Sequence, residues 1–125
     1  MNPANSLSLT FHNVEVLNSN QRLHPMAKAR LTKHIRTKAL YLAKSQAMTP
    51  MQKAHCIVQI SFADNARRDV ANYYPSVKAA IDGFIDANLL PDDDSAHLIG
   101  PDMRLGALGG KGLVGFHFEF FEVSQ

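Results

Sequence analysis

The segment Ala54-His55-Cys56-Ile57-Val58-Gln59-Ile60-Ser61-Phe62 alternates apolar and polar side chains over most of its length. In an extended chain Cys56, Val58 and Ile60 point to one side, and Ile57 is the one apolar residue on the other side. A repeat of two residues with one apolar side predicts a β-strand that buries one face.

Two segments beside this strand have a helical period instead. Residues 26–45 repeat apolar side chains every three or four positions and carry basic residues between them, which predicts an amphipathic basic helix. Its apolar positions are Leu31, Ile35, Ala39 and Leu42. A second helix is predicted from Pro75, whose missing N–H suits a first helical turn, to about Asn88. Its buried stripe is Val77, Ile81, Phe84, Ile85 and Leu89.

Three more strands complete the predicted fold. Residues 7–17 alternate with a change of phase, which predicts a strand with a bulge near His12 and Asn13. Residues 96–104 are predicted to form a short strand. The last strand buries Val114, Phe116, Phe118 and Phe120. A chain of 125 residues has room for one core, so residues 1–125 are predicted to form a single small α+β domain. We expect a mixed β-sheet and two main helices in the order β-α-β-α-β-β.

The composition is that of a globular protein, with 46% hydrophobic residues and 19% charged residues. No apolar run approaches the roughly 20 residues of a membrane-spanning helix, and residues 1–6 lack the basic start of a signal peptide. We therefore expect a cytoplasmic protein with no membrane partner. Cys56 lies in an apolar run, where a buried thiol is the favoured interpretation, and a single cysteine makes no disulfide within one chain.

The net charge of +2 conceals a segregation of charge along the chain. No acidic residue lies between Glu15 and Asp64, a stretch with eight basic residues. The balance reverses between Asp64 and Asp102. A basic stretch of this kind attracts a polyanion, although a solvated helix face explains it about equally well.

Candidate site residues follow the strand at 54–62. Asp69 precedes the second helix, Lys78 lies near the start of that helix, and Asp92-Asp93-Asp94 follows it. Carboxylates are the hard oxygen donors that Mg²⁺ and Mn²⁺ prefer, and cations among them suit a site that holds metal and phosphate together. We expect the two acidic segments to meet at one end of the sheet. The alternative is that the acidic triplet is a solvated turn, and that Asp82 and Asp86 are exposed charges on the helix face.

Four motifs in this order resemble the RusA family of Holliday-junction resolvases. They are Asn18-Ser19-Asn20-Gln21-Arg22-Leu23-His24, Arg68-Asp69-Val70-Ala71-Asn72, Lys78-Ala79-Ala80-Ile81-Asp82-Gly83 and Leu90-Pro91-Asp92-Asp93-Asp94-Ser95. The similarity of pattern extends from about Leu7 to Val123.

The resemblance implies a homodimeric, Mg²⁺-dependent endonuclease, with Mn²⁺ as a substitute, that nicks opposing strands of four-way DNA junctions. It implies Asp69, Lys78 and Asp94 as the catalytic residues and Asp69, Asp93 and Asp94 as the metal ligands. The residues expected to contact DNA are Arg22, Lys28, Arg30, Lys33, Arg36, Arg67 and Arg68. A two-fold dimer would match the paired equivalent strands of a junction.

Ala71 departs from the family pattern, because well-known members carry a second metal-binding aspartate there. Either Asp92 or Asn72 supplies the missing ligand, or the protein binds junctions without cutting them. A third hypothesis is a structural protein whose charges are only surface charges. Tyr73 and Tyr74, which lie in an insertion before Lys78, either stack on exposed bases or anchor the loop.

Overall fold

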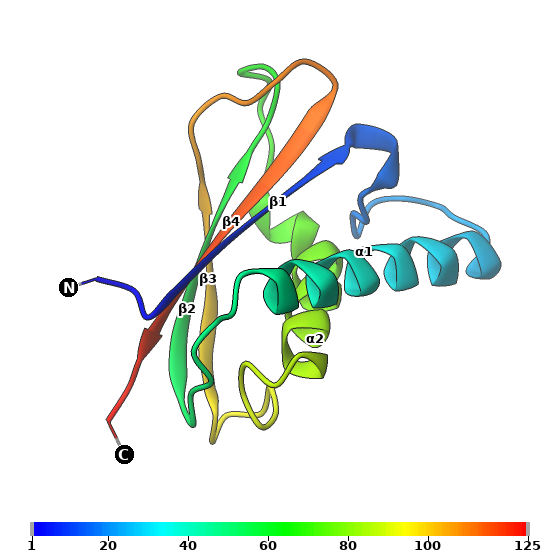
Figure 1. The fold of residues 1–125 in the computed structure, drawn as a ribbon. Helices are drawn as coiled ribbons and strands as arrows, with labels where there is room; N and C mark the ends of the chain where they lie inside the picture. The colour runs from blue at the N-terminus through cyan, green and yellow to red at the C-terminus, as the bar shows by residue number, and fades with distance from the viewer. Residues whose placement is uncertain (1, 125) are drawn as a thin grey trace.

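The computed structural model describes residues 2–124 and places strand β2 (Ala54–Ser61) inside a four-stranded mixed sheet (Figure 1). The strand order is β1-β4-β2-β3. Strand β4 (Leu113–Glu122) pairs antiparallel with both β1 (Asn5–His12) and β2, and β2 pairs parallel with β3 (Leu98–Leu105). The prediction of a single small α+β domain in the order β-α-β-α-β-β is confirmed.

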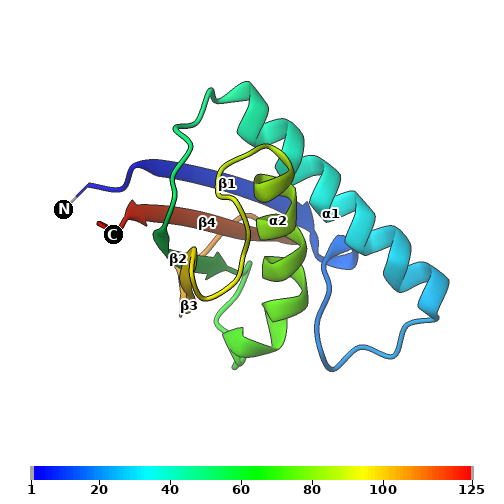
Figure 2. The same cartoon turned by 90° about the horizontal axis from the view of Figure 1, so that it is seen from below.

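Helices α1 (Pro25–Ser45) and α2 (Tyr74–Asp86) pack against each other on the same face of the sheet (Figures 1 and 2). Two short 3₁₀ helices precede them, η1 (Asn13–Glu15) before α1 and η2 (Val70–Tyr73) directly before α2. Both long helices begin with proline in the first turn, where its missing N–H costs no hydrogen bond. Both predicted helices are therefore confirmed, with ends that differ by one or two residues.

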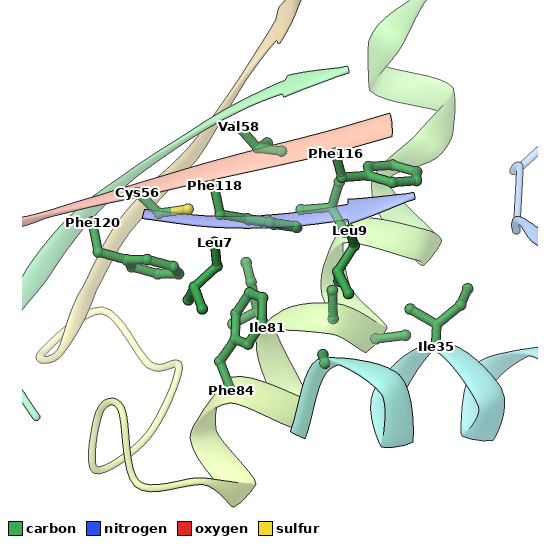
Figure 3. Close-up of a cluster of buried hydrophobic side chains, with 14 of the residues drawn as sticks. Leu7, Leu9, Ile35, Cys56, Val58, Ile81, Phe84, Phe116, Phe118 and Phe120 are labelled. Carbon is green, nitrogen blue, oxygen red and sulfur yellow. The ribbon is translucent and has the colours of Figure 1, made fainter. Parts of the chain in front are cut away.

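The core lies between the sheet and the two helices (Figure 3). Alternate residues of each inner strand point into it, as the period of two predicted, including Cys56, Val58 and Ile60 of β2. From α2, the ring of Phe84 makes edge contacts with Phe118 at 5.1 Å and Phe120 at 5.9 Å between ring centroids. Such pairs add about 0.5–1.5 kcal/mol each to the stabilisation that burial provides.

The first strand ends earlier than predicted. β1 stops at His12, and the expected bulge is replaced by η1, because the Glu15 side chain turns back to accept a hydrogen bond from the His12 amide at 2.9 Å. Val14 consequently lies outside the sheet with 78% of its surface exposed, whereas Val16 and Leu17 are buried beyond the turn. The change of phase in the sequence marked the end of the strand, not an interruption of it.

Burial accounts for the single cysteine. The Cys56 side chain has no exposed surface, and its removal from water raises the pKa of the thiol to about 12. The predicted role as a small hydrophobic residue is confirmed. Within residues 2–124 no helix is both long enough and apolar enough to cross a membrane.

Candidate functional site

Lys78 joins an acidic residue of its own helix to the acidic triplet that follows the helix. It lies in the second turn of α2, and its ammonium donates hydrogen bonds to Asp82, at 2.7 Å, and to Asp93, which is 15 residues further along the chain. The loop that carries Asp93 runs back beside α2 to reach it (Figure 2). The three side chains are 41%, 26% and 28% exposed, respectively, so they form a partly buried cluster, called here the Lys78 cluster.

The charges in the Lys78 cluster support one another. Partial burial works against the ammonium, but the hydrogen bonds to Asp82 and Asp93 outweigh it and raise the pKa of Lys78. The hydrogen bond from Lys78 in turn lowers the pKa of Asp93. Lys78 and Asp93 are therefore stabilised in their charged forms, and Asp82 supplies a second acceptor to the ammonium.

Sequence reasoning missed the role of Asp82. The expectation of an exposed helix-face charge is wrong, because Asp82 is partly buried and shares the ammonium of Lys78 with Asp93. The four-residue spacing between Lys78 and Asp82 was the available signal, since such pairs meet on a helix surface. It could not show that a third group, Asp93, would join them.

Asp86 and Arg36 also have a role that the sequence did not predict. The Arg36 guanidinium donates two hydrogen bonds to the Asp86 carboxylate, at 2.6 and 2.8 Å, across the contact between α1 and α2. This hydrogen bonding raises the pKa of Arg36 and lowers that of Asp86. Arg36, expected to contact DNA, is thus engaged in a bidentate ion pair between the helices.

Asp69 and Asp94 have local partners. Asp69 caps η2 by accepting a hydrogen bond from the Ala71 amide at 3.0 Å. Asp94 accepts from the Ala96 amide at 3.1 Å and lies 2.6 Å from Nδ1 of His97. Of the predicted acidic ligands, it is Asp93 that the fold places against Lys78.

The expectation that the acidic segments meet at one end of the sheet is wrong. Asp69 follows the carboxyl end of β2, whereas the acidic triplet leads to the opposite end, where the Ala54 amide donates to the carbonyl of His97 at 2.9 Å. Because β2 and β3 are parallel, the chain must cross from one end of the sheet to the other between them, and α2 makes that crossing. Lys78, projecting from α2, contacts the later segment through Asp93.

The donor groups limit what kind of metal site is available. Among residues 2–124, no three His, Cys, Asp or Glu side chains gather as a group that could hold a metal ion. A Mg²⁺ ion, however, often takes one or two carboxylates and completes its shell with water and substrate phosphates. Asp93 fits such a site, because its carboxylate is ionised and about a quarter exposed.

Besides Arg36, four of the seven residues predicted to contact DNA are exposed on α1 or directly before it. Arg22 precedes α1, and Lys28, Arg30 and Lys33 project from it into solvent. Lys28 borders two hollows, one of about 290 Å³ beside residues 17–23 and one of about 520 Å³ along α1. These side chains form a basic surface that suits a polyanion.

Arg67 and Arg68 lie apart from α1, in the loop after β2. Arg67 is exposed. Arg68 pairs with Asp64 at 2.7 Å and lies over the Phe62 ring, 4.5 Å from its centroid. Arg68 therefore has a structural role in this loop, as Arg36 has between the helices.

No family model matches the chain, and no curated protein matches it. The resemblance to the RusA family therefore stays a prediction, based on the motifs and not on a match.

The two neighbouring tyrosines have different surroundings. Tyr73 is partly buried, and its ring centroid lies 5.1 Å from that of Phe62. Tyr74, the first residue of α2, is 44% exposed. The anchoring role considered for both residues belongs to Tyr73, and Tyr74 keeps a ring surface available to a ligand.

Proposed function

We propose that this protein is a structure-selective endonuclease that resolves four-way DNA junctions by metal-dependent hydrolysis of phosphodiester bonds. The observation that carries the proposal is the contact between Lys78 and Asp93. These residues belong to separate motifs that the resemblance assigns to one active site. Their contact is what a shared site requires.

The Lys78 cluster suits phosphoryl chemistry on a substrate strand. The ammonium of Lys78 can neutralise charge that develops on a phosphate in the transition state. Asp93 would hold Mg²⁺, with water and substrate phosphates completing its shell. The metal, when bound, lowers the pKa of a coordinated water and polarises the phosphodiester. Asp82 keeps Lys78 in place from the same helix.

The basic surface would hold the DNA. Arg22, Lys28, Arg30 and Lys33 are exposed and would contact phosphates, so affinity should fall steeply as the salt concentration rises. Paired nicks need two active sites, and a two-fold homodimer is therefore part of the proposal. Light scattering of the purified protein tests that part directly.

The second candidate function is junction binding without cleavage. The observations that favour it are Ala71, in the place of a family aspartate, and the absence of a three-ligand group among residues 2–124. The two functions predict the same affinity for DNA and differ only in whether strands are cut.

The test is incubation with a labelled four-way junction and a linear duplex of matched sequence, with and without Mg²⁺ or Mn²⁺, followed by native and denaturing gels. We expect metal-dependent paired nicks in the junction alone. Asp93→Asn should abolish nicking and leave junction binding largely intact. The matched control is Asp102→Asn, an exposed carboxylate of β3 that pairs with His55, and this variant should cut normally.

Binding without nicks would support the second candidate. A protein that binds neither substrate would overturn both candidates and leave only the hypothesis of a structural protein.

A further inference from the structure

A hollow of about 290 Å³ lies between the loop of residues 17–23, Lys28 of α1 and Pro75 of α2. We call it the 17–23 groove. Its volume is near the lower end of the range for small-molecule sites, so it has room for a small ligand or for one unit of a polymer.

The walls of the 17–23 groove are held in place by hydrogen bonds from two directions. The hydroxyl of Ser76, which is 1% exposed, accepts from the Leu17 amide at 2.6 Å and donates to the Leu17 carbonyl at 2.8 Å. The Ser19 amide donates to the Asn72 carbonyl at 2.8 Å. The loop is thereby docked on α2 and on the segment before it. A ligand that entered would not have to order the loop first, which favours affinity.

The same loop is also braced internally. The Gln21 side chain donates to the Val16 carbonyl at 3.0 Å and accepts from the Asn18 amide at 2.9 Å. The Asn18 side chain in turn accepts from the Asn20 amide at 2.8 Å. These contacts give Asn18 and Gln21 a structural role within the loop. Arg22 of the same loop lines the groove.

The chemistry of the 17–23 groove favours an anion. Arg22 and Lys28 both line it, and its lining contains no acidic residue. Among the described residues neither of these two side chains is in an ion pair, in contrast to Arg36 and Lys78. Two cations with no carboxylate nearby are suited to a phosphate group.

An exposed aromatic residue neighbours the groove wall in the sequence. Tyr74 immediately precedes Pro75 of the groove wall and is 44% exposed. Tyr74 and Lys78 are four residues apart on α2, so they lie on the same side of the helix, one turn apart. A base stacked on Tyr74 would therefore lie close to the Lys78 cluster.

We propose that the 17–23 groove binds one nucleotide of a DNA strand, with its phosphate against Arg22 and Lys28 and its base stacked on Tyr74. The proposal rests on the proposed function, in that DNA is the ligand. Bases inside an intact duplex are stacked on their neighbours and unavailable to Tyr74, whereas a base at a branch point is accessible. The groove thus gives the protein a means to prefer branched DNA to linear duplex.

The test measures binding without metal, so that no cleavage occurs. The probes are a four-way junction with 2-aminopurine at the branch point, the matched linear duplex and a single-stranded oligothymidylate. Tyr74→Ala should weaken binding of the junction and of the single strand by about 5- to 150-fold, the range that corresponds to the loss of one stacked base. It should change duplex binding less than twofold. Tyr74→Phe, which keeps the ring, should bind like the wild type.

Two further measurements separate stacking from charge. The fluorescence of 2-aminopurine should be quenched by the wild-type protein and not by Tyr74→Ala. Arg22→Gln should weaken binding to all three DNA probes. It should also reduce the slope of log affinity against log salt concentration by about 1, as expected for the loss of one phosphate contact. The matched control for the aromatic change is Tyr41→Ala, because Tyr41 is 65% exposed on α1 and borders neither hollow.

The outcomes distinguish this inference from the proposed function. If the wild-type protein cuts junctions and Tyr74→Ala binds them equally well, the inference is overturned and the proposed function stands. If the protein never cuts DNA but binding depends on Tyr74 as described, the inference stands without the nuclease. A wild-type protein that binds none of the three probes overturns both.

Discussion

Replacing Gly83 with alanine is expected to destabilise the protein, although the same change on an exposed helix would stabilise it. Gly83 lies in α2 where this helix crosses α1. A Cβ atom added there would lie 2.2 Å from the backbone carbonyl oxygen of Arg36 and 2.8 Å from the Cβ of Ala39. Neither neighbouring atom can be moved by a side-chain rotation, so the helices must separate.

Two opposing effects set the magnitude. Alanine is favoured over glycine within a helix by about 1 kcal/mol. Overpacking costs about 1–3 kcal/mol and more in severe cases, and a 2.2 Å contact with backbone belongs at the upper end. We therefore expect a net loss of about 2 kcal/mol. With about 2.1 cal/mol/K of unfolding entropy per residue, a chain of 125 residues should show a Tm lower by about 8 °C.

Thermal and urea denaturation followed by circular dichroism give both quantities. The matched control is Gly109→Ala, where the nearest atom to an added Cβ is 3.6 Å away, an ordinary van der Waals distance. This control should change the Tm by little. A Gly83→Ala protein with a Tm equal to or above that of the wild type would refute the close approach of α1 and α2 at this point.

Three other predictions test the core, the ion pair between the helices and the docked loop. Cys56 should resist a thiol reagent at pH 8 while the protein is folded, because it is buried and its thiol pKa is about 12; rapid labelling seen by mass spectrometry would contradict this burial. The hydrogen bond from Arg36 lowers the pKa of Asp86 in the folded protein. The ion pair therefore stabilises the fold fully above the pKa that Asp86 has in the unfolded chain, and this stabilisation is lost as the pH falls through the pKa of Asp86 in the folded protein. Asp86→Asn should therefore lower the free energy of unfolding by up to about 1 kcal/mol at pH 7, a small value because the pair is partly exposed. At a pH low enough to protonate Asp86 in both the folded and the unfolded state, the same change should cost little. Equal losses of stability at pH 7 and at the low pH would argue against the ion pair. Ser76→Ala should cost about 1–3 kcal/mol in urea denaturation, because the buried amide and carbonyl of Leu17 lose their partner, and an unchanged midpoint would exclude that role.

The sequence by itself determined the elements and the class of the fold. The alternation through Cys56, Val58 and Ile60 and the helical spacing of residues 26–45 are local patterns, and each fixes both the type of element and its buried face. The strand boundary at His12 was misplaced because a period of two does not reveal a turn stabilised by the side chain of Glu15.

Only the tertiary structure decided how the charged and aromatic side chains are partnered. Arg36 meets Asp86 across 50 residues, and Lys78 meets Asp93 across 15. Partners of this kind follow no period, because a charged side chain can pair with any opposite charge that the packing of helices and loops brings within reach. Tyr73 and Tyr74, adjacent and identical in type, likewise differ only because η2 turns into α2 between them and directs one ring onto the core and the other into solvent.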